Sequence, residues 1–239
     1  MKRALITGAS GAIGSAICRA LSRDGFEVLV HANRRLDEAQ ALAQVITQAG
    51  GRARAIAFDV TDADLAAQTL GALTEERPIQ VVVNNAGMHD DAVMAGMSHT
   101  QWSRVIDVSL NGFFNVTQPL LLPMIRTRWG RIINISSVAG VMGNRGQVNY
   151  AAAKSALHGA TKSLAIEVAS RGITVNAVAP GIIASPMADG TFSKEHIDAL
   201  VPMKRAGTPE EVADLVAFLA SERAAYISGQ IISINGGMA

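Results

Sequence analysis

The chain has 239 residues, of which 49% are hydrophobic and 17% are charged, so it can bury a sizeable core and is not expected to be disordered. Its 21 basic and 20 acidic residues give a net charge of +1, which offers no electrostatic argument for binding nucleic acid or an anionic membrane. The single cysteine, Cys18, cannot form an internal disulfide, and this favours a reducing, cytoplasmic setting. The sequence has no apolar run of about 18 residues, so no membrane span is expected, and no metal is expected either.

Short runs rich in Val and Ile alternate with longer helical patterns along the chain. Runs such as QVVVNN and RIINIS lack polar alternation, which is typical of strands buried on both faces of a parallel sheet. The segments between them are long enough for helical crossovers. We therefore predict one α/β domain over 1–239, with a Rossmann-type, doubly wound, seven-stranded parallel sheet and helices on both faces. The predicted strands are Ala4–Thr7, Glu27–His31, Arg54–Phe58, Val81–Asn84, Arg131–Ile135, Thr174–Val178 and Ile231–Ile234.

A glycine-rich turn and a helix follow the first predicted strand, in the segment ALITGASGAIGSAICRAL at 4–21. Small residues in this turn let backbone N–H groups approach a diphosphate, and the helix N-terminus adds a partial positive charge. The glycine spacing is neither that of the G-x-G-x-x-G motif nor that of a P-loop. The strand–turn–helix context nevertheless favours nucleotide binding over a tight turn without a ligand. The residues expected to line the site are Gly8, Ser10, Gly11, Ala12, Ile13 and Gly14.

The second predicted strand leads into Asn33, Arg34 and Arg35. Folds that bind NAD usually offer an acid at this place to the ribose 2′-hydroxyl. Here no carboxylate competes with a 2′-phosphate, and two guanidinium groups could bind it. The segment therefore indicates NADPH as the cofactor, the alternative being a solvated basic start to the next helix.

Polar and small residues also follow the third and fourth predicted strands, in FDV at 58–60 and NNAG at 84–87. Ligands of open α/β sheets bind at the C-terminal ends of the strands. Asp59 is expected to accept a hydrogen bond from an adenine amino group. The other residues expected to line the cofactor here are Val60, Asn84, Asn85, Ala86 and Gly87.

A long helix is predicted over about 98–126. Ser98 and Gln101 fit a capping box at its start. Pro119 and Pro123 are expected to perturb it further along, because proline lacks the backbone N–H that an interior position needs.

A second long helix is predicted over about 149–170, and it ends at Gly172, a typical C-cap residue. Near its start, Tyr150 and Lys154 lie four positions apart, so they share one face. Taken alone, this pair could be incidental on a surface helix. The irregular residues 182–207 are predicted to include a substrate lid.

Several motifs occur together in a specific order and spacing. They are TGASGAIG at 7–14, NNAG at 84–87, Asn111, Ser137, Tyr150 with Lys154, and PG at 180–181. This set resembles the short-chain dehydrogenase/reductase family along essentially the whole chain. The resemblance implies an oxidoreductase with four catalytic residues, Asn111, Ser137, Tyr150 and Lys154.

The resemblance also implies a role for each of these residues. Tyr150 would be the general acid in reduction and the general base in oxidation, and the Lys154 ammonium, together with an oxidised nicotinamide, would lower its pKa. Ser137 would donate a hydrogen bond to the substrate oxygen, and the backbone carbonyl of Asn111 would position a water for the proton relay. Lys154 would also hold the nicotinamide ribose. The implied cofactor contacts on this side are Tyr150, Lys154, Pro180, Gly181, Ile183 and Ser185, the last standing where threonine is more usual.

Within the family, the chain is most similar to the 3-oxoacyl-[acyl-carrier-protein] reductases, in the stretches at 140–157, 167–183 and 226–239. This similarity implies NADPH-dependent reduction of a 3-oxoacyl thioester on acyl carrier protein, in fatty acid or polyene-type biosynthesis, by a homotetramer. Arg128 and Arg171 match two arginines that dock the acidic carrier protein, which we expect near the active-site mouth, although they could be ordinary surface residues. His89 and Asp90 replace the more usual Thr-Arg, which raises the possibility of a specialised carrier-bound substrate.

Two other functions stay open on the sequence. An NAD(P)-dependent dehydrogenase of a small alcohol, sugar or steroid would share all the catalytic residues. The arginines described above favour NADPH and a carrier-bound substrate over that alternative. A cofactor-binding regulator without turnover is disfavoured, because the whole catalytic set is present.

Overall fold

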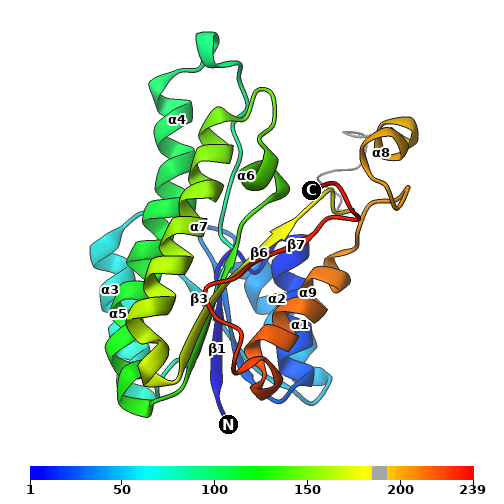
Figure 1. Ribbon diagram of the computed structural model, residues 1–239. Helices are drawn as coiled ribbons and strands as arrows, with labels where there is room; N and C mark the ends of the chain where they lie inside the picture. Colours follow the sequence, from blue (N-terminus) through cyan, green and yellow to red (C-terminus); the bar gives the residue numbers. More distant parts are fainter. Residues whose placement is uncertain (185–192) are drawn as a thin grey trace.

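The computed structural model describes residues 1–184 and 193–239, and its centre is a seven-stranded sheet (Figure 1). The strand order is β3-β2-β1-β4-β5-β6-β7, and every neighbouring pair is parallel. β2 and β3 therefore lie on one side of β1, and β4 to β7 lie on the other. This arrangement confirms the predicted Rossmann-type, doubly wound sheet. The strands are β1 (Arg3–Ile6), β2 (Glu27–Ala32), β3 (Arg52–Ala57), β4 (Val81–Asn84), β5 (Gly130–Ile135), β6 (Ile173–Pro180) and β7 (Ile231–Ile234).

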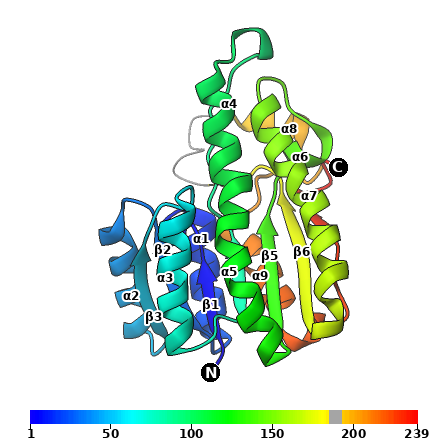
Figure 2. The same cartoon turned by 90° about the vertical axis from the view of Figure 1, so that its left-hand side faces the viewer.

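Helices cover both faces of this sheet (Figures 1 and 2). One layer contains α1 (Ala12–Arg23), α2 (Leu36–Gln48) and α9 (Pro209–Ala220), and the other contains α3 (Ala63–Glu76), α5 (Gly112–Thr127) and α7 (Val148–Val168). Successive strand side chains point to opposite faces, so Leu5 and Ile6 of β1 join different core clusters, and both are fully buried. Burial on both faces explains why the central strands β4 and β5 are rich in Val and Ile.

The predicted long helix at 98–126 starts as expected but is interrupted. Ser98 and Gln101 form the capping box, with the backbone N–H of each residue donating to the side-chain oxygen of the other. α4 (His99–Ile106) then gives way to a π-helical turn, η2 (Asp107–Asn111), before α5 begins. α5 runs through both Pro119 and Pro123, so the helix is interrupted at η2 and not at the prolines. The two prolines are four positions apart, so their missing donors fall on one side of the helix.

The second long helix ends where predicted. A 3₁₀ turn, η3 (Ala169–Arg171), follows α7 and leads to Gly172, which adopts a left-handed conformation with φ of +73°. A Cβ on Gly172 would collide with the carbonyl oxygen of Arg128, so only glycine fits there. None of the helices among the described residues is long and apolar enough to cross a membrane. The short helices are η1 (Met94–Gly96), α6 (Val138–Met142), α8 (Lys194–Leu200) and η4 (Glu222–Ala224).

Candidate active site

A cavity of about 1030 Å³ lies at the C-terminal ends of β1 to β4. This is the edge at which open α/β sheets bind their ligands. Most of the residues predicted to contact a cofactor meet in it. They are Gly8, Ser10, Gly11, Ala12, Ile13, Gly14, Asn33, Arg34, Arg35, Asp59, Val60, Asn85, Ala86, Gly87 and Ile183.

The glycine turn forms a close-packed cradle at one side of this cavity. A Cβ on Gly14 would lie 2.5 Å from the carbonyl oxygen of Gly8 and 2.8 Å from Cα of Ala9, so the start of α1 packs directly on the turn. Gly8 itself has a positive φ of +60°. Backbone N–H groups and a helix N-terminus without bulky side chains fit a diphosphate, so the residues present suit a dinucleotide cofactor.

His31, which the sequence analysis did not identify, forms a hydrogen bond with the backbone of this turn. Its Nδ1 accepts a hydrogen bond from the backbone N–H of Gly8 (3.2 Å), and its Nε2–H donates to the carbonyl of Phe58 (2.9 Å). Burial lowers the pKa of His31 to about 4, so the imidazole is neutral in this arrangement. The sequence feature that could have identified His31 is its position within β2, beside the apolar residues of that strand.

The two arginines on the basic side of the cavity differ in their ion pairing. Arg35 pairs with Glu38 at the start of α2 (2.9 Å), whereas Arg34 forms no ion pair within the described part of the chain. Asp59 accepts hydrogen bonds from Thr61 and Asn33. Burial raises the pKa of Asp59, but these hydrogen bonds and the charge of Arg34 outweigh burial, so the net shift is downward. Arg34 is therefore the better placed of the two arginines to meet an added anion.

Ser137, Tyr150 and Lys154 gather where β5 ends. Ser137 is the N-cap of α6, and its Oγ accepts a hydrogen bond from the backbone N–H of Ala139 (3.1 Å). Lys154 donates from Nζ to the carbonyl oxygen of Ile135 (2.8 Å), and this Nζ lies 5.6 Å from the centre of the Tyr150 ring. The group adjoins the cavity, because a Cβ on Gly87 in the cavity wall would lie 3.1 Å from the lysine Nζ.

Burial changes the proton affinities of both groups. It raises the pKa of Tyr150, Asp91 adds to this shift, and the hydrogen bond with Ser137 opposes it. In the chain alone the phenol therefore shifts in the direction opposite to the one predicted, because its burial outweighs the stabilisation of the phenolate. Burial also lowers the pKa of Lys154 to about 8.

Asn111 is the last residue of η2, and the catalytic role expected for its backbone carbonyl stays a prediction. Its side chain is exposed and donates to Oδ1 of Asp107 (2.8 Å), and Asn111 does not line the cavity. On the same π-helical turn, Ser109 is only 3% exposed, and its Oγ has no hydrogen-bond partner among the described residues. A Cβ on Gly87 would lie 3.6 Å from this Oγ, so Ser109 is the η2 residue that faces Lys154. The sequence carried no signal for Ser109, because the phase of the π-helical turn decides which side chain points inward.

Other predicted cofactor contacts are placed differently. The buried Asn84 donates to Thr117 and to Asn134 and does not line the cavity. Pro180 ends β6 and Gly181 follows it, where a Cβ on Gly181 would lie 2.8 Å from Cα of Asn235. Of this segment, only Ile183 among the described residues lines the cavity. Ser185 lies outside the described residues.

Arg128 and Arg171 lie side by side but not at the mouth of the site. Arg128 donates to the carbonyl of Ser170 (3.2 Å). The two arginines precede β5 and β6, whereas Ser137 follows β5. Residues before and after a parallel strand lie at opposite edges of the sheet, so the expected position near the mouth of the same chain is wrong.

His89 and Asp90 have separate surroundings. The rings of His89 and Tyr150 are arranged edge to face, with their centroids 6.5 Å apart, so His89 lies beside the candidate site. Asp90 accepts a hydrogen bond from Gln101 (2.9 Å) and pairs with Arg104 (3.7 Å), so it anchors its loop to α4.

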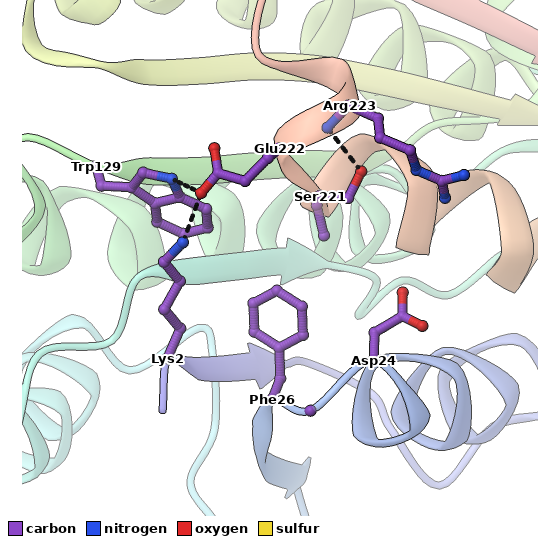
Figure 3. Close-up of a pocket in the computed structure, with 9 residues that line it drawn as sticks. Lys2, Asp24, Phe26, Trp129, Ser221, Glu222 and Arg223 are labelled. Atoms are coloured by element: carbon purple, nitrogen blue, oxygen red, sulfur yellow. Dashed lines mark hydrogen bonds and ion pairs between the residues drawn. The ribbon is translucent and has the colours of Figure 1, made fainter.

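A second cavity, of about 430 Å³, lies at the opposite edge of the sheet (Figure 3). There Glu222 accepts hydrogen bonds from Lys2 (2.7 Å) and from the indole of Trp129 (2.9 Å), and the Lys2 ammonium lies 3.6 Å from the indole ring centre. These polar groups satisfy one another, so this cavity is explained by packing between the ends of the chain. In the described parts of the chain, no group of three or more His, Cys, Asp or Glu side chains could hold a metal.

Comparison with known proteins agrees with this geometry. A family model described as short chain dehydrogenase matches residues 2–196. The chain is 45% identical to the 3-oxoacyl-[acyl-carrier-protein] reductase FabG of Aggregatibacter actinomycetemcomitans, over 98% of each chain. It is 44% identical to the protein of the same name from Staphylococcus aureus (strain Mu50 / ATCC 700699), over 99% of this chain and 98% of the relative. It is also 44% identical to nodulation protein G of Rhizobium sp. (strain N33), over 100% of this chain and 97% of the relative. The chain therefore belongs to the short-chain dehydrogenase family and is an oxidoreductase that binds a nicotinamide cofactor.

Proposed function

We propose that this oxidoreductase reduces a 3-oxoacyl thioester on acyl carrier protein to the 3-hydroxyacyl form, with NADPH as the cofactor. The observation that carries the proposal is the grouping of Ser137, Tyr150 and Lys154 beside a cavity that has Arg34 on its wall. The names of two similar proteins support the substrate class. Fatty acid biosynthesis is the proposed setting, with polyene-type synthesis as the alternative.

The cofactor preference is proposed from charge. Arg34 forms no ion pair in the described part of the chain and can meet a 2′-phosphate, and none of residues 33–35, which directly follow β2, is an acid. A guanidinium binds phosphate through charge-assisted, two-pronged hydrogen bonds. NADPH is therefore favoured over NADH.

The proposed chemistry follows from the protonation states. The bound cofactor would supply the hydride that attacks the ketone carbon. The raised pKa of Tyr150 keeps its phenol protonated at neutral pH, so it can give a proton to the ketone oxygen as negative charge develops there. The Ser137 hydroxyl hydrogen-bonds Tyr150 in the chain alone, and with substrate bound it would donate to the same ketone oxygen. The Lys154 ammonium would stabilise the tyrosinate that results.

We also propose a homotetramer, supported by apolar side chains on the outer faces of α5 and α7. Phe114 and Leu122 are 62% and 63% exposed, and Ile166 is 82% exposed. Exposed apolar surface on adjoining helices is typical of an interface between copies. A two-fold axis that pairs these helices antiparallel would bring Arg128 and Arg171 of one copy toward the site of the next, and in this form we keep them as the docking pair.

The proposed function is tested by following NADPH and NADH oxidation with acetoacetyl-carrier protein and with acetoacetyl-CoA. We expect turnover with NADPH that strongly prefers the carrier-bound substrate. Replacing both Arg128 and Arg171 with Ala should reduce turnover of the carrier-bound substrate and spare acetoacetyl-CoA. Turnover with NADH, or no preference for the carrier, would instead support a dehydrogenase of small molecules.

A further inference from the structure

Asn149 directly precedes Tyr150, and its amide side chain is completely buried, with an exposed fraction of 0%. A polar side chain that leaves water on folding needs hydrogen bonds inside the protein. The Asn149 Nδ2 donates to the backbone carbonyls of Asp90 (3.0 Å) and Gln101 (3.1 Å). Its Oδ1 accepts from the backbone N–H of Tyr150 (2.8 Å). One side chain therefore joins the start of α7 to the loop after β4 and to α4, which lies beside α7 (Figures 1 and 2).

The hydrogen bond to Tyr150 meets a need of the helix start. The first N–H groups of a helix have no acceptor within the helix itself. In the described chain, Gln147 is the N-cap residue of α7 and provides no side-chain cap. The Asn149 Oδ1 supplies the acceptor instead, so it holds the stretch of backbone from which the Tyr150 phenol projects.

The loop after β4 borders the phenol on one side. The ring of His89 packs edge to face against the Tyr150 ring. Burial raises the pKa of Tyr150, and the negative charge of Asp91 on this loop adds to the shift. The position of the loop therefore affects both the space beside the phenol and its proton affinity.

Two further contacts join the same loop to the segment before α7. The backbone N–H of Ala92 donates to the carbonyl of Gly146 (2.9 Å), and Asp91 accepts a hydrogen bond from the Gln147 side chain (2.8 Å). The contact between Asp91 and Gln147 is exposed, whereas the Asn149 amide is fully buried. A hydrogen bond shielded from water holds its geometry more firmly than an exposed one.

We propose that Asn149 is a positioning residue for the proton donor, because its amide fixes the Tyr150 backbone relative to the loop that carries His89. The catalytic part of this inference rests on the proposed function. A displacement of about 1 Å in a reacting group can cost about 100-fold in rate, so such a link acts on kcat. Asn149 is not among the described residues that line the large cavity, so NADPH binding should not depend on it.

The first test compares Asn149→Ala with Asn176→Ala in the reduction of acetoacetyl-carrier protein. Asn176 is the matched control, since it is 1% exposed, donates to the carbonyl of Ile227 (2.8 Å) and accepts from the N–H of Gln230 (3.1 Å). Both variants lose a buried amide, so the Tm of each should fall by about 4–8 °C. Only Asn149→Ala should also lower kcat, by about 10- to 100-fold, with the KM for NADPH unchanged.

A graded variant separates positioning from stability. Asn149→Asp has the same shape and keeps the acceptor for the Tyr150 N–H, and its protonated form can donate to one of the two carbonyls. Its kcat should therefore lie between those of the wild type and Asn149→Ala. Should Asn149→Ala not fold, Asn149→Asp is compared with Asn176→Asp in the same way. Equal kcat values at the two positions, or a raised KM for NADPH with unchanged kcat, would overturn the proposal.

The second test is amide hydrogen exchange of the protein without cofactor or substrate. In the Asn149 variant the amides of Tyr150 and Ala92 should exchange at least about 10-fold faster than in the wild type, and in the Asn176 variant they should not. Unchanged exchange at both amides would overturn the proposal. If the wild type does not reduce acetoacetyl-carrier protein but exchange rises as expected, the proposed function fails while the positioning by Asn149 stands.

Discussion

Around Tyr150, burial acts on two neighbouring groups in ways that suit reduction. It keeps the phenol protonated by raising its pKa, and it brings the pKa of Lys154 down to about 8. The protonated phenol is therefore available at neutral pH. As the pH rises, Lys154 loses its proton before Tyr150 does.

This sets the expected pH dependence of reduction. Lys154 is charged below pH 8 and loses its proton above it, so kcat/KM for NADPH-dependent reduction should be steady near pH 7 and fall above about pH 8. The measurement is the initial rate between pH 6 and pH 10 at limiting substrate. A rate that stays constant up to pH 10 would contradict the assignment of Lys154.

The two arginines after β2 should differ in importance. Arg34→Ala removes the guanidinium proposed to meet the 2′-phosphate, so KM for NADPH should rise about 10- to 100-fold while KM for NADH changes little. Arg35→Ala is the matched comparison, and its effect should be smaller because Arg35 already pairs with Glu38. Equal losses with both cofactors would show that Arg34 does not read the 2′-phosphate.

The residues of the site were predictable where chemistry fixes the residue type. Tyr150 and Lys154 were assigned through the family resemblance of the whole motif set, because their shared helix face alone could be incidental. The glycine turn was identified because its small residues follow a strand. Ser109 could not be distinguished from Asn111, since the π-helical turn changes the helix phase at that point. For Asn84, the sequence could not show that its side chain is buried and donates to Thr117 and Asn134, because a polar residue at a strand end can face either a ligand or a buried network.

Among the elements, the turn between β1 and α1 restricts its residue types most strongly. Gly14→Ala would place a methyl group 2.5 Å from a backbone oxygen that cannot move freely, so we expect a loss of about 1–3 kcal/mol in the free energy of unfolding and weaker NADPH binding. Gly71→Ala in α3 is the matched control. Its Cβ would meet nothing within 4 Å, so it should stabilise the protein by about 0.5–1 kcal/mol. Urea unfolding measures the free energy of unfolding of both variants. Equal changes in the two variants would contradict the close packing at Gly14.

The strands were predictable from sequence because burial on both faces demands continuous Val and Ile runs, and β4 and β7 have the predicted bounds. The π-helical turn was not, because its residues fit an ordinary helical pattern. The prolines misled for a related reason. A missing N–H weakens a helix, but the packing of α5 against α3 and the sheet holds it together.

For the whole molecule, the outer face of α5 and α7 should decide the oligomeric state. Leu122→Glu places a charge in the proposed interface and should convert the tetramer to smaller species in light scattering after size-exclusion chromatography. Val45→Glu on α2 is the matched control, since Val45 is 49% exposed on the opposite layer, and it should leave the assembly intact. A Leu122→Glu variant with the same mass as the wild type would exclude this interface.

The doubly wound, seven-stranded parallel sheet was predictable at this scale, but the position of the docking arginines was misjudged. The order of residues along the chain already placed Arg128 before β5 and Ser137 after it. Only the second copy proposed above can bring these arginines to a substrate entrance, and a single sequence does not show how copies pack.

The most direct test of the account compares wild-type protein with Tyr150→Phe in a single turnover of NADPH on acetoacetyl-carrier protein. The account predicts that the variant still binds NADPH and loses at least about 100-fold in the rate of reduction, because the proton donor is gone. A variant that still reduces the substrate near the wild-type rate would contradict the central claim that Tyr150 protonates the ketone oxygen.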